Sequence, residues 1–298
     1  MTDWQPHTVV TEEIFDPGRV RALAQIFDDG LPTPEAGDPL PPLWHWVALP
    51  EWAPSSELGL DGHPRRGSFL PPIDLPRRMF AGGSVEFPGI VRVGDRVRRE
   101  SIVESVTEKN GRSGALTVVV VSTTLVAPDG TAAVVEKQNL IYREAAPTSD
   151  APAADPDPAA AFVPVGRPMV PAGADRWDLR TDPTLLMRFS AATANAHRIH
   201  YDWPYATRVE GYPGLVVHGP LMTMALAQTH RLLDDGTRIA ALRHRNLKPL
   251  FCGNPAQLVY TRSDDGAHVE LVGPDAVSSD AVSSDGAAHT TLDLTLTS

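Results

Sequence analysis

One order of elements occurs twice along this chain, and that repetition restricts the fold more than any other feature. Each half opens on a helix at an Asp-Pro pair, continues with an apolar segment that begins at proline, and ends in several β-rich segments. Asp is a favourable N-cap and Pro fits the first helical turn, so Asp16-Pro17 and Asp182-Pro183 predict helix starts. The chain is therefore expected to be a duplicated α+β protein.

The N-terminal half predicts two helices and then an antiparallel sheet of about four strands. The second helix is expected in the apolar segment L-W-H-W-V-A-L, with its start at Pro41 or Pro42. A long irregular stretch, residues 50–76, follows and is expected to be a loop that covers another part of the protein. From Arg77 onward the segments are β-rich, and Asn-Gly and Asp-Gly pairs between them are strong hairpin signals.

The C-terminal half contains an additional polar loop. Pro17 and Pro42 are 25 positions apart, whereas Pro183 and Pro220 are 37 apart, a difference of 12. That difference roughly matches a polar loop at residues 195–205. The long apolar helix expected from Pro220 is followed by four further β-rich segments. The extra loop predicts one active site per chain, in the C-terminal half.

Composition divides the two halves and limits the function classes. Residues 144–162 are rich in Ala, Pro and acidic residues without Lys or Arg, which is typical of a linker. We therefore expect an N-terminal domain at 1–143, a linker at 144–172 and a catalytic domain at 173–298. The sequence A-V-S-S-D, given in tandem at residues 276–285, is expected to form a solvated hairpin extension.

The net charge of −11 argues against a nucleic-acid partner. The single cysteine, Cys252, excludes an intramolecular disulfide and fits a reducing compartment. The first residues show no signal peptide, and no window has the length and apolarity of a membrane span. The expected location is the cytoplasm.

Two motifs in the C-terminal half carry a family resemblance. The run H-Y-D-W-P-Y-A at 200–206, followed by G-L-V-V-H-G-P-L at 214–221, resembles the hydratase motif of MaoC-like dehydratases and (R)-specific enoyl-CoA hydratases. The resemblance implies a double hot-dog fold, in which each of two units is a long helix wrapped by an antiparallel sheet. His200 falls on the catalytic histidine of that family, Asp202 on the aspartate that follows it, and Gly219 on the glycine whose N–H binds the thioester carbonyl.

The sequence departs from that motif at one catalytic position, where Asn195 stands in place of an aspartate. The variant N-A-H-R-I-H-Y-D resembles the branch of mitochondrial-type 3-hydroxyacyl-thioester dehydratases and bacterial mesaconyl-C4-CoA hydratases. Residues 58–72 and 75–83 resemble the first domain of that branch. The branch implies a hydro-lyase that needs no cofactor beyond the CoA of its substrate, as a monomer or homodimer.

The expected reaction is hydration of mesaconyl-C4-CoA to (S)-citramalyl-CoA. The alternatives are a 3-hydroxyacyl-ACP or -CoA dehydratase of fatty-acid or polyketide synthesis, a hot-dog thioesterase, and a non-catalytic acyl-thioester binding protein.

Hydration of a double bond conjugated to a thioester needs a base for water, an acid for the α-carbon, and stabilisation of the enolate oxygen. His200 can serve as base and acid, because imidazole titrates near neutrality. Gly219 and His218 begin a helix whose unpaired N–H groups can bind the oxygen. Asn195 either orients water or is only a helix C-cap, and Asp202 is either a proton carrier or a structural carboxylate.

Five arginines are candidates for binding CoA phosphates or a free acyl carboxylate, because the guanidinium forms a fork of donors: Arg77, Arg78, Arg198, Arg243 and Arg245. Arg243 and Arg245 share one face of an expected strand. The alternative is that they are solvated charges at strand ends. His197 is more typical of a surface histidine, and no metal site is expected, although His197, His200 and Asp202 are close in sequence.

Overall fold

The computed structural model describes residues 4–111, 114–144, 166–273 and 288–297. The stretch 144–162, rich in Ala, Pro and acidic residues, therefore lies outside the described residues apart from residue 144. The tandem repeat at 276–285 lies wholly outside them. No helix in the described ranges is both long enough and apolar enough to cross a membrane.

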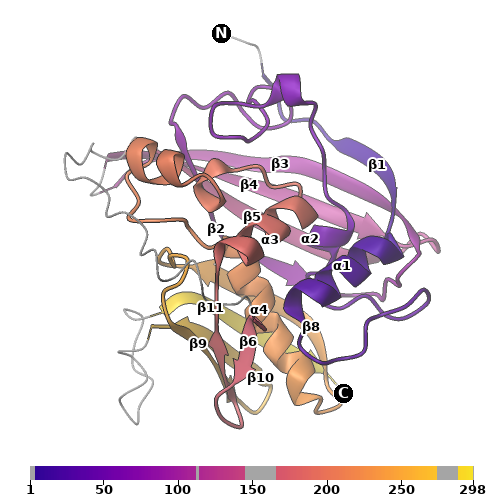
Figure 1. Ribbon diagram of the computed structural model, residues 1–298. Helices are drawn as coiled ribbons and strands as arrows, with labels where there is room; N and C mark the ends of the chain where they lie inside the picture. The colour runs from indigo at the N-terminus through magenta and orange to yellow at the C-terminus, as the bar shows by residue number, and fades with distance from the viewer. Residues whose placement is uncertain (1–3, 112–113, 145–165, 274–287, 298) are drawn as a thin grey trace.

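The described strands form one antiparallel sheet in the order β1-β3-β4-β5-β2-β8-β11-β10-β9-β7-β6. All eight strands expected from the sequence are present: β2 (Arg77–Glu86), β3 (Arg96–Gly111), β4 (Gly114–Val126), β5 (Ala132–Arg143), β8 (Arg238–Asn246), β9 (Ala256–Arg262), β10 (Gly266–Val272) and β11 (Ala288–Thr297). The four N-terminal strands form one half of the sheet and the four C-terminal strands the other (Figure 1).

The two halves of the sheet are joined by pairing between β2 and β8, from Gly82 opposite Arg245 to Glu86 opposite Ala241. Each half would otherwise expose an unpaired strand edge at this position. The pairing makes the sheet continuous, and it brings residues of β2 next to the start of the C-terminal helix.

Three described strands were not predicted: β1 (Val9–Ile14), β6 (Met169–Pro171) and β7 (Arg176–Leu179). Residues of β1 are mostly exposed on both faces, so the strand lacks the alternation that would reveal it. Strands β6 and β7 are only three and four residues long. Because β6 lies within 144–172, the end of the linker expected at residue 172 was wrong, and ordered structure of the C-terminal half begins earlier.

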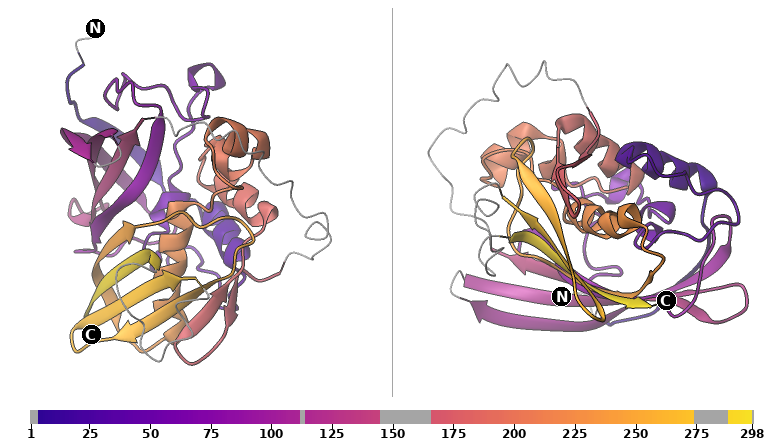
Figure 2. Two further views of the ribbon diagram at one scale, coloured as in Figure 1. Left: turned by 90° about the vertical axis from the view of Figure 1, so that its left-hand side faces the viewer. Right: turned by 90° about the horizontal axis from the view of Figure 1, so that it is seen from below.

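Three helices begin where the sequence predicted. Helix α1 (Pro17–Phe27) is capped by Asp16, which accepts from the N–H of Gly18, and α3 (Pro183–Ala192) is capped by Asp182. Helix α4 (Gly219–Leu233) is buried over most of its length, and the C-terminal strands β9, β10 and β11 wrap around it (Figure 2). This half has the expected arrangement of a helix enclosed by a curved sheet.

The N-terminal half lacks the long helix that was expected. Helix α2 (His45–Ala48) has four residues, and its chain does not become helical at Pro41 or Pro42. Leu43 has a left-handed φ of 68°, which breaks the helical path just before α2, and Pro50 follows its end. Helix α1 supplies most of the helical surface that this half packs against the core.

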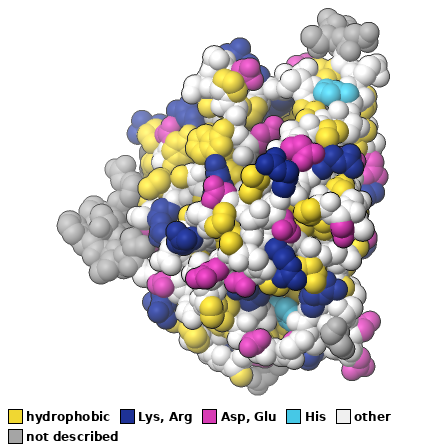
Figure 3. Space-filling model, turned by 90° about the vertical axis from the view of Figure 1, so that its right-hand side faces the viewer, with side chains coloured by type: hydrophobic (Ala, Val, Ile, Leu, Met, Phe, Trp, Pro, Cys, Tyr) yellow, Lys and Arg dark blue, Asp and Glu magenta, His cyan; other side chains and the backbone are white. Residues whose placement is uncertain are grey.

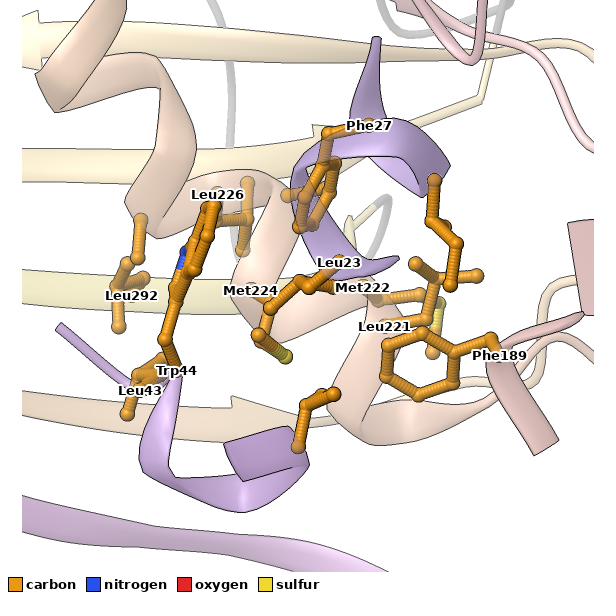
Figure 4. Packing of buried hydrophobic residues seen from close by; sticks show 14 of the residues in the cluster. Leu23, Phe27, Leu43, Trp44, Phe189, Leu221, Met222, Met224, Leu226 and Leu292 are labelled. Carbon is orange, nitrogen blue, oxygen red and sulfur yellow. The ribbon is translucent and has the colours of Figure 1, made fainter. Parts of the chain in front are cut away.

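The helices of both halves share one hydrophobic core. Figure 4 shows Leu23 and Phe27 of α1 and Trp44 packed close to Met224 of α4 and Phe189 of α3. The rings of Phe27 and Trp44 stack with centroids 6.3 Å apart. Because this core crosses between the halves, it fixes the end of α3 and the start of α4 against the N-terminal half.

On the outer face drawn in Figure 3, acidic and basic side chains are interspersed.

The N-terminal half also buries a histidine next to a carboxylate at α2. His45 Nε2 lies 3.1 Å from Glu136 Oε2, and both side chains are almost fully buried. Trp46 Nε1 and Gln138 Nε2 donate to Glu136 Oε1 at 2.8 and 2.7 Å. Burial acts to raise the pKa of Glu136, but the hydrogen bonds and the His45 charge outweigh it, and the pKa is lowered. His45 is therefore already committed to a structural partner.

We expect His45→Ala to lower the stability of the protein and leave turnover of the folded enzyme near normal. Removing one partner of a buried pair leaves an uncompensated carboxylate, at a cost of about 3–5 kcal/mol. Thermal unfolding and kcat would be measured on the same preparation. His45→Ala combined with Glu136→Gln should regain part of the lost stability, because an amide needs no counter-charge. A kcat loss above about a hundredfold with an intact fold would contradict the structural role.

Candidate active site

The candidate site lies in the segment that connects α3 to α4. After α3 the chain changes direction at Ala194, which has a left-handed φ of 53°. The N–H of the next residue, Asn195, donates to the carbonyl of Ser190 at 2.9 Å. Asn195 Oδ1 accepts from the N–H of His197 at 3.1 Å. The left-handed position is thus Ala194 rather than Asn195, and the Asn195 side chain shapes the turn that leads into η3 (Arg198–His200).

His200 is buried and held in one tautomer. Its Nδ1 lies 2.7 Å from the carbonyl oxygen of Val216, which can only accept, so Nδ1 carries the proton. Val216 is fixed by its own N–H, which donates to Ile199, and by a β-bridge to Phe251. In neutral His200 the lone pair is therefore on Nε2, where no described residue forms a hydrogen bond. This is the arrangement that a general base requires.

His218 stacks directly on His200, with ring centroids 3.6 Å apart and planes at 19°. Its Nε2 is 2.8 Å from Ser190 Oγ on α3, and its buried Nδ1 has no hydrogen-bond partner among the described residues. Burial, followed by the charge of His197, lowers the pKa of His218 to about 3. Burial, then the charges of His218 and His197, also holds the pKa of His200 well below 6.5. Both imidazoles are consequently neutral at pH 7.

Gly219 is the first residue of α4, and no acceptor among the described residues takes its N–H. A Cβ at this position would lie 3.0 Å from Asn246 Nδ2 and 3.2 Å from Phe80 Cδ1. The absence of a side chain thus gives close access to an N–H at the positive end of a helix. A developing oxyanion could be stabilised there, beside the His200–His218 stack.

A loop of the N-terminal half covers this segment. The N–H of Arg198 donates to the carbonyl of Asp61 at 2.9 Å, and Arg198 Nη1 donates to the carbonyl of Leu60 at 3.1 Å. A Cβ on Gly62 would lie 1.9 Å from the carbonyl oxygen of Ala196, so only glycine permits this approach. The loop expected at 50–76 therefore covers the candidate site.

The same loop adds His63 and Asp61, which sequence reasoning did not single out as site residues. The ring centroid of His63 is 4.4 Å from that of His197, which in turn is 5.5 Å from that of His200. Burial and then the charge of Arg78 lower the pKa of His63 to about 3. Burial acts to raise the pKa of Asp61, yet its contacts with His63 lower it to about 2. At pH 7 this contact is a hydrogen bond from a neutral imidazole to a carboxylate.

His197 is buried, so the expectation of a surface histidine was wrong. Its Nε2 lies 3.3 Å from Glu210 Oε1, which also accepts from the Tyr205 hydroxyl at 3.4 Å. Arg77 Nε lies 3.4 Å from the other oxygen of Glu210. Glu210 thus connects three side chains: His197 just before η3, Tyr205 on η4 (Tyr205–Val209), and Arg77 on β2.

Asp202 has structural contacts. Arg198 Nε donates to its Oδ2 at 2.9 Å, and the N–H of Tyr205 donates to its Oδ1 at 3.1 Å. The hydrogen bond from Arg198 is the largest cause that lowers the pKa of Asp202. Arg198 also lies over the ring of Tyr205, at 4.3 Å from its centroid. Neither Asp202 nor Arg198 has a described side-chain contact with His200. Their contacts with each other and with Tyr205 instead stabilise the loop between α3 and α4.

The remaining candidate arginines lie on two neighbouring strands, β8 and β2. Arg243 and Arg245 share one face of β8, as predicted, but that face is exposed, while Leu242 and His244 are buried on the other. The structure therefore does not bring this pair to the candidate site, because strand alternation points it away from α4. Arg78, on β2, is partly accessible and acts on His63 through its charge.

Asp61, His63 and His197 are the group best placed to hold a metal ion, since their ligand atoms lie within 4.8 Å of one another. The sequence places His197, His200 and Asp202 close together instead. In the structure, however, Asp202 forms an ion pair with Arg198. The charge of Arg78 next to His63 disfavours a second cation.

The fold and the site together define a double hot-dog protein built for hydration or dehydration of an acyl thioester. The family model for hydroxyacyl-thioester dehydratase type 2 matches residues 43–252. The chain is 40% identical to mesaconyl-C4-CoA hydratase of Chloroflexus aurantiacus over 280 residues, 93% of this chain and 95% of that protein. The chain therefore belongs to the hydroxyacyl-thioester dehydratase type 2 family, and it is a hydro-lyase.

Shorter and more distant matches agree with that assignment. The mitochondrial hydroxyacyl-thioester dehydratase type 2 of Schizosaccharomyces pombe is 32% identical over 84 residues, 28% of each chain. Among solved structures, HtdX of Mycobacterium tuberculosis superimposes with a TM-score of 0.62 at 19% identity, over 97% of this chain and 99% of that one. A second M. tuberculosis protein, described as a double hot-dog fold, gives 0.53 at 18% identity over 99% and 96%. These structures support the predicted fold.

The low pKa of His200 has a consequence for the pH dependence of the enzyme. A base that titrates well below 6.5 stays unprotonated as the pH falls through 6.5, so kcat/KM should stay near its neutral value at that pH. The loss of enoyl-thioester absorbance would give the profile, with circular dichroism at each pH as the control for folding. A half-maximal kcat/KM at or above pH 6.5 in a folded protein would show that His200 is not held neutral in this way.

Proposed function

We propose that this chain catalyses the reversible hydration of mesaconyl-C4-CoA, or of a similar branched enoyl-CoA, to (S)-citramalyl-CoA. The observation that supports the substrate is the 40% identity to the Chloroflexus aurantiacus hydratase along nearly its full length. The geometry of His200 and Gly219 supports the chemistry. The substrate supplies the CoA, and the mechanism that follows uses only side chains and backbone groups of this chain.

His200 is the general base and acid in this proposal. Its Nε2 lone pair takes a proton from a water molecule, whose oxygen forms a bond to the β-carbon of the enoyl thioester. Electron density then moves onto the thioester oxygen, where the N–H of Gly219 and the N-terminus of α4 stabilise it. The imidazolium returns its proton to the α-carbon, so one water is added and His200 is regenerated. The Val216 carbonyl holds the ring in place and favours the transient imidazolium.

Asn195 takes the place of a carboxylate in this mechanism. An amide cannot accept a proton at neutral pH, but its N–H groups can orient the attacking water. The contact of its Oδ1 with His197 leaves the amide nitrogen available among the described residues. We therefore assign all proton transfer to His200, and a structural role to Asp202.

A second candidate is the dehydration of a 3-hydroxyacyl thioester on CoA or a carrier protein. The match to the type 2 dehydratase family favours it, since dehydration uses the same groups in the reverse order. A cytoplasmic location is part of the proposal and is supported by Cys252, a single free cysteine, which fits a reducing compartment. We propose a monomer or homodimer without nucleic-acid or membrane partners.

Replacement of the proposed base is the direct test. His200→Ala should lower kcat on the order of 10²–10⁴-fold and change substrate binding little, because CoA is held elsewhere. Enoyl-thioester absorbance follows hydration, and an assay for free thiol would detect thioester cleavage. His7→Ala, at an exposed histidine, is the matched control. Wild-type kcat in folded His200→Ala would rule out this mechanism, and thiol release by the wild type would indicate a thioesterase.

Asn195→Asp tests the role of the amide. The carboxylate can still accept from the N–H of His197, so the turn should survive. A negative charge next to the substrate should then lower kcat/KM for mesaconyl-C4-CoA, which carries its own carboxylate, more than for crotonyl-CoA, which does not. Steady-state kinetics on both thioesters would give the ratio. Equal improvement on both substrates would show that the asparagine has no substrate-specific role.

A further inference from the structure

Arg78 lies on the wall of the site that β2 provides. Arg78 and Phe80 are two residues apart on this strand, so their side chains project from the same face. Phe80 borders Gly219, since its Cδ1 would be 3.2 Å from a Cβ at that residue. The irregularity in β2 comes after Phe80 and does not disturb this alternation. Arg78 therefore faces the side of the sheet where the thioester oxygen would bind.

Tyr142 lies directly opposite Arg78 in the pairing of β2 with β5. Its side chain is fully buried, and its hydroxyl has no hydrogen-bond partner among the described residues. A buried hydroxyl without a partner costs free energy that a bound acceptor would offset. Arg78 and Tyr142 thus present two neighbouring donor groups without an acceptor.

Arg78 has neither an ion pair nor a hydrogen-bond acceptor in the described part of the chain, unlike the other arginines near the site. Arg77 meets Glu210, and Arg198 meets Asp202. Arg66 donates to three backbone carbonyls, those of Ile73, Leu75 and Pro76. Burial lowers the pKa of Arg78, and the charge of Asp61 acts against it without an ion-pair contact. A guanidinium remains protonated in these surroundings and needs an anion.

The charge of Arg78 acts on the outermost ring of the histidine group that contains His200. It acts on His63, whose ring lies 4.4 Å from His197, and His197 lies 5.5 Å from His200. The phosphates of CoA are separated from the thioester by the pantetheine arm, so a group at this end of the site is poorly placed to bind them. An anion on the acyl group itself is better placed.

We propose, on the basis of the function proposed above, that Arg78 binds a free carboxylate on the acyl group, with the Tyr142 hydroxyl as second donor. In mesaconyl-C4-CoA the carboxylate is attached to the β-carbon, the atom that water attacks. A receptor for it must therefore lie close to His200 rather than along the CoA arm. A guanidinium fork binds both carboxylate oxygens and fixes the direction in which the double bond lies. Arg78 is thereby the residue that selects dicarboxylic acyl thioesters.

Crotonyl-CoA is the comparison substrate, because it is an uncharged enoyl thioester whose methyl group lies trans to the thioester, in the position that the carboxylate has in mesaconyl-C4-CoA. Arg78→Met should lower kcat/KM for mesaconyl-C4-CoA on the order of 10²–10³-fold, the effect of removing one partner of a buried charge pair. Its kcat/KM for crotonyl-CoA should change by less than about threefold, since no group that touches that acyl chain is altered. Arg78→Lys should retain part of the selectivity, and Tyr142→Phe should lose a smaller part. Arg245→Met, on the exposed face of β8, should change neither value.

Binding without turnover separates this proposal from the proposed function. Succinyl-CoA and butyryl-CoA are saturated and differ only in the carboxylate, and titration calorimetry can compare them on wild type and Arg78→Met. A preference for succinyl-CoA that disappears in Arg78→Met supports the carboxylate receptor, even if the wild type fails to hydrate mesaconyl-C4-CoA. Two results would overturn it: no preference in the wild type, or the same preference in folded Arg78→Met. Equal loss of activity on both enoyl substrates would show that Arg78 only supports the structure.

Discussion

The hydrogen bond from His200 Nδ1 to the carbonyl of Val216 is the contact on which the site depends. A carbonyl accepts only, so this one contact decides which nitrogen keeps the lone pair and where it points. The carbonyl is itself fixed, since Val216 is bonded to Ile199 and bridged to Phe251. The ring of His218 stacks on the same imidazole and thereby packs the proposed base against the start of α4.

In the proposed mechanism the two similar halves of the chain have different tasks. The C-terminal half supplies His200 and the N–H of Gly219, while the N-terminal half supplies the covering loop and Arg78. The N-terminal half also has a buried histidine next to a carboxylate, but His45 and Glu136 bind one another. A pair that satisfies itself inside the core has no free lone pair to offer a substrate. The pairing of β2 with β8 allows the two contributions to meet.

Local chemistry made much of the fold predictable, and long-range contacts account for the rest. Asp16 and Asp182 cap helices through bonds to residues two and three positions away, so the sequence reveals them. The left-handed conformation of Leu43, which shortens α2, has no such local signal. His63 reaches the site through the contacts that the 50–76 loop makes with Ala196 and Arg198. Its only signal was the resemblance of residues 58–72 to a family domain.

The electrostatics of the histidines and the arginine are consistent with one another. Burial is the largest cause of the low pKa of His63, and the charge of Arg78 is the second. A carboxylate bound to Arg78 would cancel the second cause and leave the first, so His63 would remain neutral with substrate present. His218 is neutral because of burial in both states. In the proposed mechanism the imidazolium that forms during the reaction is then that of His200.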